Sequence, residues 1–179
     1  MAKTHLYDGE TFEHKGYTFR VEFQHDQDNG APWDECDGHG IVSDWTRRQK
    51  APGERLLAES RGSFRYYDIA ETIKIARRDK WGPATEIAGE SARARAARAV
   101  NEDYEYLRLW CSDQWQYLGV IVTHVEFDDD DNEVDTDLSE SLWGVESYKD
   151  YHMTVAYELA DELVARLEVD EPLVVLGEN

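Results

Sequence analysis

The sequence predicts an α+β fold: a small antiparallel or mixed sheet, made of an N-terminal hairpin and a central strand, packed by three main helices. Residues 17–23 alternate between apolar and polar side chains, as in a strand with one buried and one solvated face. Residues 148–168 instead repeat apolar side chains every three or four positions, as in an amphipathic helix. At 179 residues and 41% hydrophobic side chains, the chain is large and apolar enough to build a real core.

The N-terminal part is expected to contain a hairpin, a long loop and a second strand. Residues 11–13 lead into a turn at 14–16, and the alternating strand follows. Residues 25–54 are rich in Gly, Pro, Asp and Asn, which is typical of a loop. Residues 55–60 are the second expected strand. Four apolar residues are expected to pin the loop to the core: Trp33, Ile41, Val42 and Trp45.

The middle of the chain predicts two helices and a strand. A helix is expected over 63–80, because apolar residues recur at helical spacing and Gly82-Pro83 follows as a stop signal. A second helix is expected over 91–112, where strong helix formers begin the segment. Residues 117–127 are β-rich and continuously apolar in the middle, which indicates a central strand covered on both faces.

The C-terminal part is expected to begin with an acidic turn or short loop at 128–137. Residues 142–145 follow as an apolar anchor, and the last helix occupies 148–168. Residues 173–176 are expected to add a short strand or to pack as a tail. No internal repeat and no clear linker is present, so residues 1–179 are expected to form a single α+β domain, with a weak subdivision near 82–90.

The negative charge is unevenly distributed. The formal net charge is −20, of which residues 1–46 contribute −7, residues 47–100 contribute +6 and the acidic C-terminal half, 101–179, contributes −19. That half holds 22 acids against three bases, whereas ordinary soluble surfaces intersperse both signs. Self-repulsion on this scale destabilises a compact state, so we expect the acidity to serve a purpose beyond solubility.

Several classes of protein are excluded by composition. No apolar run approaches the roughly 20 residues of a membrane span, and the N-terminus lacks the apolar stretch of a signal peptide. Cys36 and Cys111 are too few for a disulfide framework, although one bridge between them stays open. We therefore expect a cytoplasmic protein that has no membrane partner.

One cluster contains residue types that bind metals. Asp34, Cys36, Asp37 and His39 lie within six residues, and each can ligate a metal ion. Because only half of a zinc pattern is present, turn formation is the favoured interpretation of this segment. A metal-binding protein or metal-dependent enzyme built on these four residues is the first alternative function.

Catalytic and cofactor motifs are absent from the sequence. There is no nucleophile elbow, phosphate-binding glycine loop or His-Glu-x-x-His pair, which favours a non-enzymatic protein. Acids between Asp129 and Glu140 are spaced as in an EF-hand loop, but Val134 occupies the position where the sharp turn needs glycine. We expect no dedicated cofactor there, only loose binding of divalent cations.

A basic patch at 74–98 suggests a second alternative, a nucleic-acid-binding accessory protein. The net charge of −20 argues against direct nucleic-acid binding, because a polyanion repels such a chain, and the patch is expected to pair with acids of the same molecule instead. The patch consists of six side chains: Lys74, Arg77, Arg78, Arg93, Arg95 and Arg98.

The acidic surface itself is the strongest functional signal. Carboxylates on a rigid scaffold can approximate the phosphates of duplex DNA and compete for a groove that binds nucleic acid. A merely solvated face is the competing interpretation. The residues expected to bind a partner are Asp128, Asp129, Asp130, Asp131, Asp135, Asp137, Glu158, Asp161 and Glu162.

Several segments resemble uncharacterised small proteins of tailed bacteriophages and prophages. They are Gly30-Ala31-Pro32-Trp33, Gly38-His39-Gly40-x-Val42-Ser43, Pro52-Gly53-Glu54-Arg55, Tyr66-Tyr67-Asp68, Lys74-Ile75-Ala76-Arg77-Arg78-Asp79-x-Trp81-Gly82 and Leu142-Trp143-Gly144-Val145-Glu146-Ser147. The resemblance implies a phage accessory protein made in the bacterial cytoplasm, a setting in which small acidic proteins often inhibit host defence. Together with the charge, it predicts a non-enzymatic inhibitor of a host nucleic-acid-handling complex, of anti-CRISPR or anti-restriction type.

Overall fold

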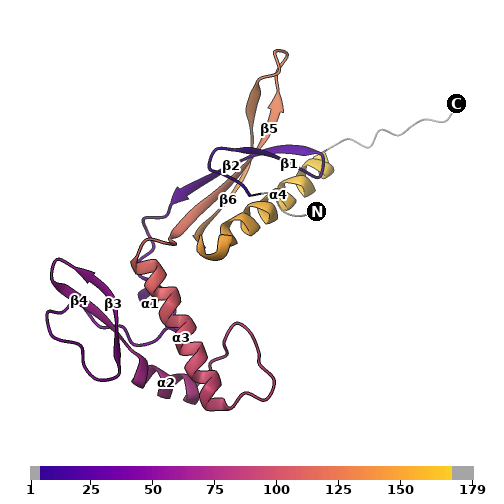
Figure 1. Cartoon of the computed structure of the whole chain (residues 1–179). Helices are drawn as coiled ribbons and strands as arrows, with labels where there is room; N and C mark the ends of the chain where they lie inside the picture. The colour runs from indigo at the N-terminus through magenta and orange to yellow at the C-terminus, as the bar shows by residue number, and fades with distance from the viewer. Residues whose placement is uncertain (1–4, 171–179) are drawn as a thin grey trace. The chain divides into compact units, whose positions relative to one another are not determined.

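A computed structural model, which describes residues 5–170, confirms the α+β class (Figure 1). The chain forms two compact units: residues 1–28 with 116–179, and residues 29–115. We call the first the sheet unit and the second the inserted unit, because its residues lie in the connection between two paired strands. The division thus falls after Asp28 and before Gln116, while the expected break at 82–90 lies inside the inserted unit. The expected element at 173–176 lies outside the described residues.

The sheet unit contains a four-stranded antiparallel sheet with the order β1-β2-β5-β6 (Figure 1). A 3₁₀ turn, η1, leads from the sheet into a long helix, α4, which packs on one sheet face. The elements are β1 Thr11–His14, β2 Tyr17–His25, β5 Tyr117–Phe127, β6 Glu133–Glu146, η1 Tyr148–Asp150 and α4 Tyr151–Asp170.

The β1–β2 hairpin and helix α4 follow the expectations from the sequence. Lys15 and Gly16 form a two-residue turn, and both have positive φ angles, 51° and 89°, as tight hairpin turns require. Phe19 and Val21 point toward α4 and are fully buried. The helix contributes one apolar stripe to the same core: Val155, Ala156, Leu159, Ala160, Leu163 and Val164.

The sheet face opposite α4 carries polar residues from β2 and β6. Arg20 lies between Phe19 and Val21 in the strand, so its side chain leaves the face that α4 covers. On that open face of β5, Ile121 is only partly buried, and Gly119 lies under the indole of Trp143. The expected central strand is confirmed: β5 lies between β2 and β6, and its residues 117–125 are buried or partly buried on both faces. Helix α4 covers one face, and the indole of Trp143 covers part of the other.

Strand β6 corrects the expectation of an acidic loop at 128–137 followed by an isolated anchor. Only residues 128–132 form the turn, and the remaining acids lie in a strand of 14 residues. Leu138 packs against the core, whereas its neighbour Asp137 is exposed. A strand tolerates acids at alternate positions when one sheet face is open to water, which explains why an acidic segment pairs with β5.

The end of strand β2 is attached to β6 by Asp26. This carboxylate is 6% exposed and accepts hydrogen bonds from the backbone amides of Gly144 at 2.9 Å and Asp28 at 3.0 Å. The backbone amide of Asp26 also donates a hydrogen bond to the carbonyl oxygen of Tyr117 at 3.0 Å. These bonds hold the two ends of the sheet unit together where the chain leaves it.

The inserted unit combines a β-hairpin with two main helices (Figure 1). Its core contains Leu57, Tyr67, Ala76, Val100 and Leu107. The elements are α1 Pro32–Glu35, β3 Glu54–Ser60, β4 Ser63–Asp68, α2 Ile69–Arg78 and α3 Ala92–Cys111.

The expected helix over 63–80 is wrong in its first third. Residues 63–68 are strand β4, which pairs with β3, and the helix begins only at Ile69. Asp68 marks the change, because its carboxylate caps α2 by accepting a hydrogen bond from the amide of Glu71 at 2.9 Å. The aromatic residues Phe64 and Tyr67 match helical spacing, but they are also strong strand formers, and pairing with β3 decides the outcome.

The long loop is pinned to the core by fewer residues than expected. Trp33 and Val42 pack against the core, and Val42 also forms a bridge with Tyr67 of β4. Ile41 and Trp45 are instead 44% and 47% exposed, so their expected burial is wrong. The loop remains ordered because its backbone pairs with β4.

The carboxylate of Asp103, on α3, holds residues 39 and 40 of this loop in place. Asp103 accepts hydrogen bonds from the hydroxyl of Tyr67 at 2.6 Å and from the amide of Gly40 at 2.8 Å, and it contacts Nδ1 of His39 at 2.6 Å. The ring of His39 stacks on Tyr106. Because Gly40 has no side chain, its backbone can approach within reach of the carboxylate.

Replacing Gly40 with alanine is predicted to destabilise the inserted unit by about 3 kcal/mol. The added Cβ would lie 2.1 Å from the hydroxyl oxygen of Tyr67, whose ring is fully buried and has no room to move. Chemical denaturation of both proteins measures the difference in free energy of unfolding. Gly82→Ala is the matched control, since its Cβ would meet only the end of the Arg95 side chain, at 3.3 Å. Equal destabilisation by the two changes would contradict this account.

Candidate functional site

The negative charge belongs almost entirely to the sheet unit. Residues 1–28 and 116–179 hold 24 of the 39 acids and five of the 19 bases, a net charge of −19. The inserted unit holds 15 acids and 14 bases, a net charge of −1. The acidic C-terminal half is thus not one structural body, because its first residues belong to α3 in the nearly neutral inserted unit. The basic stretch is balanced mostly within that same unit.

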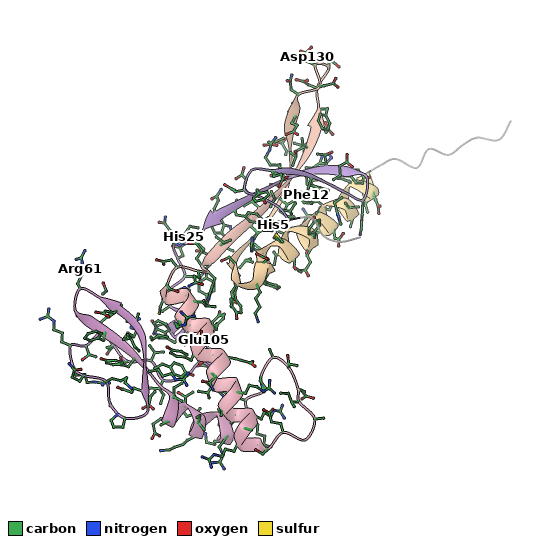
Figure 2. All side chains as sticks on the ribbon, viewed as in Figure 1. His5, Phe12, His25, Arg61, Glu105 and Asp130 are labelled. Carbon is green, nitrogen blue, oxygen red and sulfur yellow. The ribbon has the colours of Figure 1, made fainter. Side chains whose placement is uncertain are left out.

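Four of the predicted partner-binding acids lie at the tip of the β5–β6 hairpin, which we call the tip surface (Asp128–Asp131). Figure 2 shows Asp130 at this tip. Strand β2 pairs with β5 only as far as Val125, so residues 126–134 extend beyond it as a two-stranded ribbon. The tip surface is therefore borne on a projecting element.

The tip loop is shaped by one of its own acids. The carboxylate of Asp128 accepts hydrogen bonds from the side-chain amide of Asn132 and from the backbone amides of Asn132 and Asp130. The side-chain bond from Asn132, followed by the backbone bonds, lowers the pKa of Asp128. Asp129, Asp130 and Asp131 are exposed, and their carboxylates have no partner among residues 5–170. Three of the four acids are thus available to a binding partner.

Asp135 and Asp137 lie on the open sheet face, away from α4. Asp135 forms an ion pair with Arg20, which also contacts Glu133 at 2.9 Å. These acids raise the pKa of Arg20, the hydrogen bond with Glu133 being the largest cause. Asp137 is exposed and unpaired within the described part of the chain. Asp135 is therefore partly neutralised, whereas Asp137 is not.

The remaining three predicted acids lie on α4. Glu158 and Glu162 are exposed and have no partner among the described residues; we call them the helix surface. Asp161 instead contacts Nε2 of His14 at 2.5 Å and Nζ of Lys15 at 2.8 Å. The hydrogen bonds from His14 and Lys15 lower the pKa of Asp161. This carboxylate attaches the helix to the β1–β2 turn.

The nine predicted acids therefore occupy three places on one unit and do not form a single face. Asp135 and Asp137 lie on the open sheet face. The helix surface lies on α4, which covers the other face of the sheet. The tip surface lies beyond the point where β2 stops pairing with β5. The three places lie on different elements, so each can be altered separately by mutation.

The four candidate metal ligands are not brought together. Among residues 5–170, no three His, Cys, Asp or Glu side chains gather as a metal site would require. Asp34 lies in the short helix α1, Cys36 is exposed at its end, and Nδ1 of His39 contacts Asp103. The role of His39 is thus to fix the loop on α3, and this contact joins residues 64 positions apart that no local motif indicates.

The basic patch is only partly neutralised. Lys74 pairs with Glu71, Arg78 with Asp79 and Arg98 with Glu90. Arg95 forms an ion pair with Glu86 at 3.5 Å, whereas Arg77 and Arg93 have no acidic partner in the described structure. The expected pairing within the molecule is therefore present for four of the six residues of the patch.

Comparisons with known proteins identify no relative. No protein-family model, no curated protein and no solved structure matches the chain. The resemblance to phage proteins thus stays a prediction. Within residues 5–170, no helix combines the length and the apolar character that crossing a membrane requires.

The two cysteines are predicted to react at very different rates. Both thiols are free: Cys36 is exposed, whereas burial raises the pKa of the Cys111 thiol to about 11. With this pKa, Cys111 is almost wholly protonated at pH 8. It should react slowly, because the thiolate is the nucleophile. Labelling with iodoacetamide at that pH should modify Cys36 rapidly and Cys111 only after denaturation. Rapid modification of both in the native protein, read by mass spectrometry, would contradict the described packing.

Proposed function

We propose that this protein inhibits a host nucleic-acid-handling complex by placing its sheet unit in the groove that normally binds nucleic acid. The observation that carries the proposal is the charge of −19 confined to that unit. In the sequence-based interpretation the protein is phage-encoded and non-enzymatic, and it acts in the cytoplasm of the bacterial host. CRISPR effector complexes and restriction enzymes are the target classes that fit this chemistry.

Charge density supports a partial mimic of nucleic acid. Each strand of duplex DNA presents one phosphate every ~3.4 Å along the axis. Strand β6 carries Glu133, Asp135 and Asp137 at alternate positions, which corresponds to one acid every ~6.8 Å. The tip surface is denser, with four consecutive acids. The match is therefore one of local charge density, and it does not reproduce the phosphate register.

The projecting ribbon supports the tip surface as the principal contact. A two-stranded ribbon is narrow, and the β5–β6 ladder continues to Phe127 and Glu133, directly below the turn. The acids at the tip are held on a preorganised element, so little conformational entropy is lost when a partner binds. The helix surface contains two unpaired acids, whereas the tip surface contains three. We therefore expect the tip surface to contribute more to affinity than the helix surface.

Charge reversal tests this proposal against a panel of purified CRISPR effector complexes and restriction enzymes. At least one member should lose binding to its DNA when the wild-type protein is added. The tip variant D129K/D130K should weaken that inhibition by about tenfold or more, because close charge pairs across such interfaces carry large coupling energies. The helix variant E158K/E162K should weaken it less.

A matched control lies in the inserted unit. D44K/E59K changes the net charge by the same amount at two exposed acids that have no side-chain partner in the described structure. This variant should inhibit as well as wild type. Circular dichroism and melting curves confirm that all variants remain folded. An equal loss in the control would show that only net charge matters, and a panel with no inhibited member would contradict the proposal.

A further inference from the structure

A cavity of about 360 Å³ lies in the inserted unit between the end of α2 and the start of α3. Its volume is at the small end of the range that small-molecule sites occupy. Its lining is divided by chemistry into an apolar part and a cationic part, with no acid among the lining residues. The residues are Ala76, Trp81, Ala92 and Ala96, together with Arg77, Lys80 and Arg95.

Two of the three cations of this cavity have no ion pair. Arg77 and Lys80 have no acidic partner among the described residues, whereas Arg95 forms an ion pair with the highly exposed Glu86 at 3.5 Å. Lys74 and Arg78, on the same helix, are paired with Glu71 and Asp79. Arg77 and Arg78 both lie in the last turn of α2, where cations stabilise the C-terminal end of a helix. That effect does not account for Arg95, which comes from α3.

Lys80 occupies a backbone position that favours glycine. It follows the C-cap of α2 with φ +57°, and the amide of Trp81 closes the turn by donating to the carbonyl of Ala76 at 2.9 Å. This is the left-handed position of a Schellman motif, where a side chain is strained and glycine is not. A lysine at this position keeps a cation on the cavity wall at a cost in stability.

We propose that this cavity binds a free mononucleotide. Arginine forks match phosphate oxygens bidentately, and a lysine adds a point charge, so the three cations suit a phosphate group. The indole of Trp81 and the alanine methyl groups suit the flat face of a base, since stacking on an aromatic ring is tolerant of base identity. A terminal phosphate on a nucleic-acid strand has the same chemistry, but a chain of charge −20 repels a polyanion.

Calorimetric titration of the full chain with AMP tests the proposal. AMP should bind with one site per chain, and both adenosine and inorganic phosphate should bind at least tenfold more weakly. A 5′-phosphorylated oligonucleotide should also bind more weakly than AMP at low salt, and the gap should narrow as salt screens the repulsion. Equal affinity for adenosine and AMP, or no binding of AMP at millimolar concentration, would overturn the proposal. Tighter binding of the oligonucleotide would assign the site to strand ends instead.

Single substitutions distinguish binding of AMP in the cavity from a general effect of net charge on AMP affinity. R77A and R95A should each weaken AMP binding about tenfold or more. Lys80→Gly should weaken it while raising the melting temperature by about 2 °C, because strain is relieved. R78A removes an equal charge outside the cavity and should leave AMP affinity unchanged. If R78A weakened binding as much as R77A, the effect would come from net charge, and the cavity would not be the site.

Discussion

The pairing of β2 with β5 is the interaction on which the sheet unit depends. The ladder runs from Thr18 opposite Val125 to His25 opposite Leu118 and joins segments separated by the whole inserted unit. It brings Phe19 and Val21 beside Val122, and this row forms the floor on which α4 packs. Closing so long a loop costs entropy that grows only slowly with its length, so the ladder and the core beneath α4 can offset it.

The sheet unit can fold despite its acidity because each element turns its apolar residues toward the core and its acids toward water. Helix α4 buries one stripe against the sheet and exposes Glu158 and Glu162 on the other. Where acids crowd against neighbouring elements, a cation lies beside them, as Arg20 does beside Asp135 and Lys15 beside Asp161. The acids without such partners extend into water, where their mutual repulsion is screened. These unpaired acids carry the proposed function.

The sequence predicts correctly those elements whose signals come from neighbouring residues. The turn at Lys15 and Gly16, the alternating strand β2 and the helix capped by Ser91 were all expected, because each depends on neighbouring residues. The sequence predicts a helix in place of strand β4, because Phe64 and Tyr67 fit either period and only pairing with β3 decides between them. The first part of strand β6 cannot be predicted from the sequence, because its acids are typical of a loop unless the open sheet face is known.

The candidate sites show the same limit. The acidic residues could be chosen from composition, but their separation into a tip surface, a sheet face and a helix surface depends on the β5–β6 register. The boundary between the units was not visible, because β2 and β5 meet through a contact of long sequence separation. The contact of His39 with Asp103, and the cavity between Arg77 and Arg95, likewise join residues that no spacing rule connects.

The most direct measurement is competition between nucleic acid and the host partner of this protein. The full-length protein is immobilised, exposed to bacterial host lysate at physiological salt, and then washed with duplex DNA or with the same mass of neutral dextran. DNA should release a nucleic-acid-binding complex and dextran should not, because carboxylates and phosphates compete for one groove. Captured proteins that remain bound in excess DNA would contradict it.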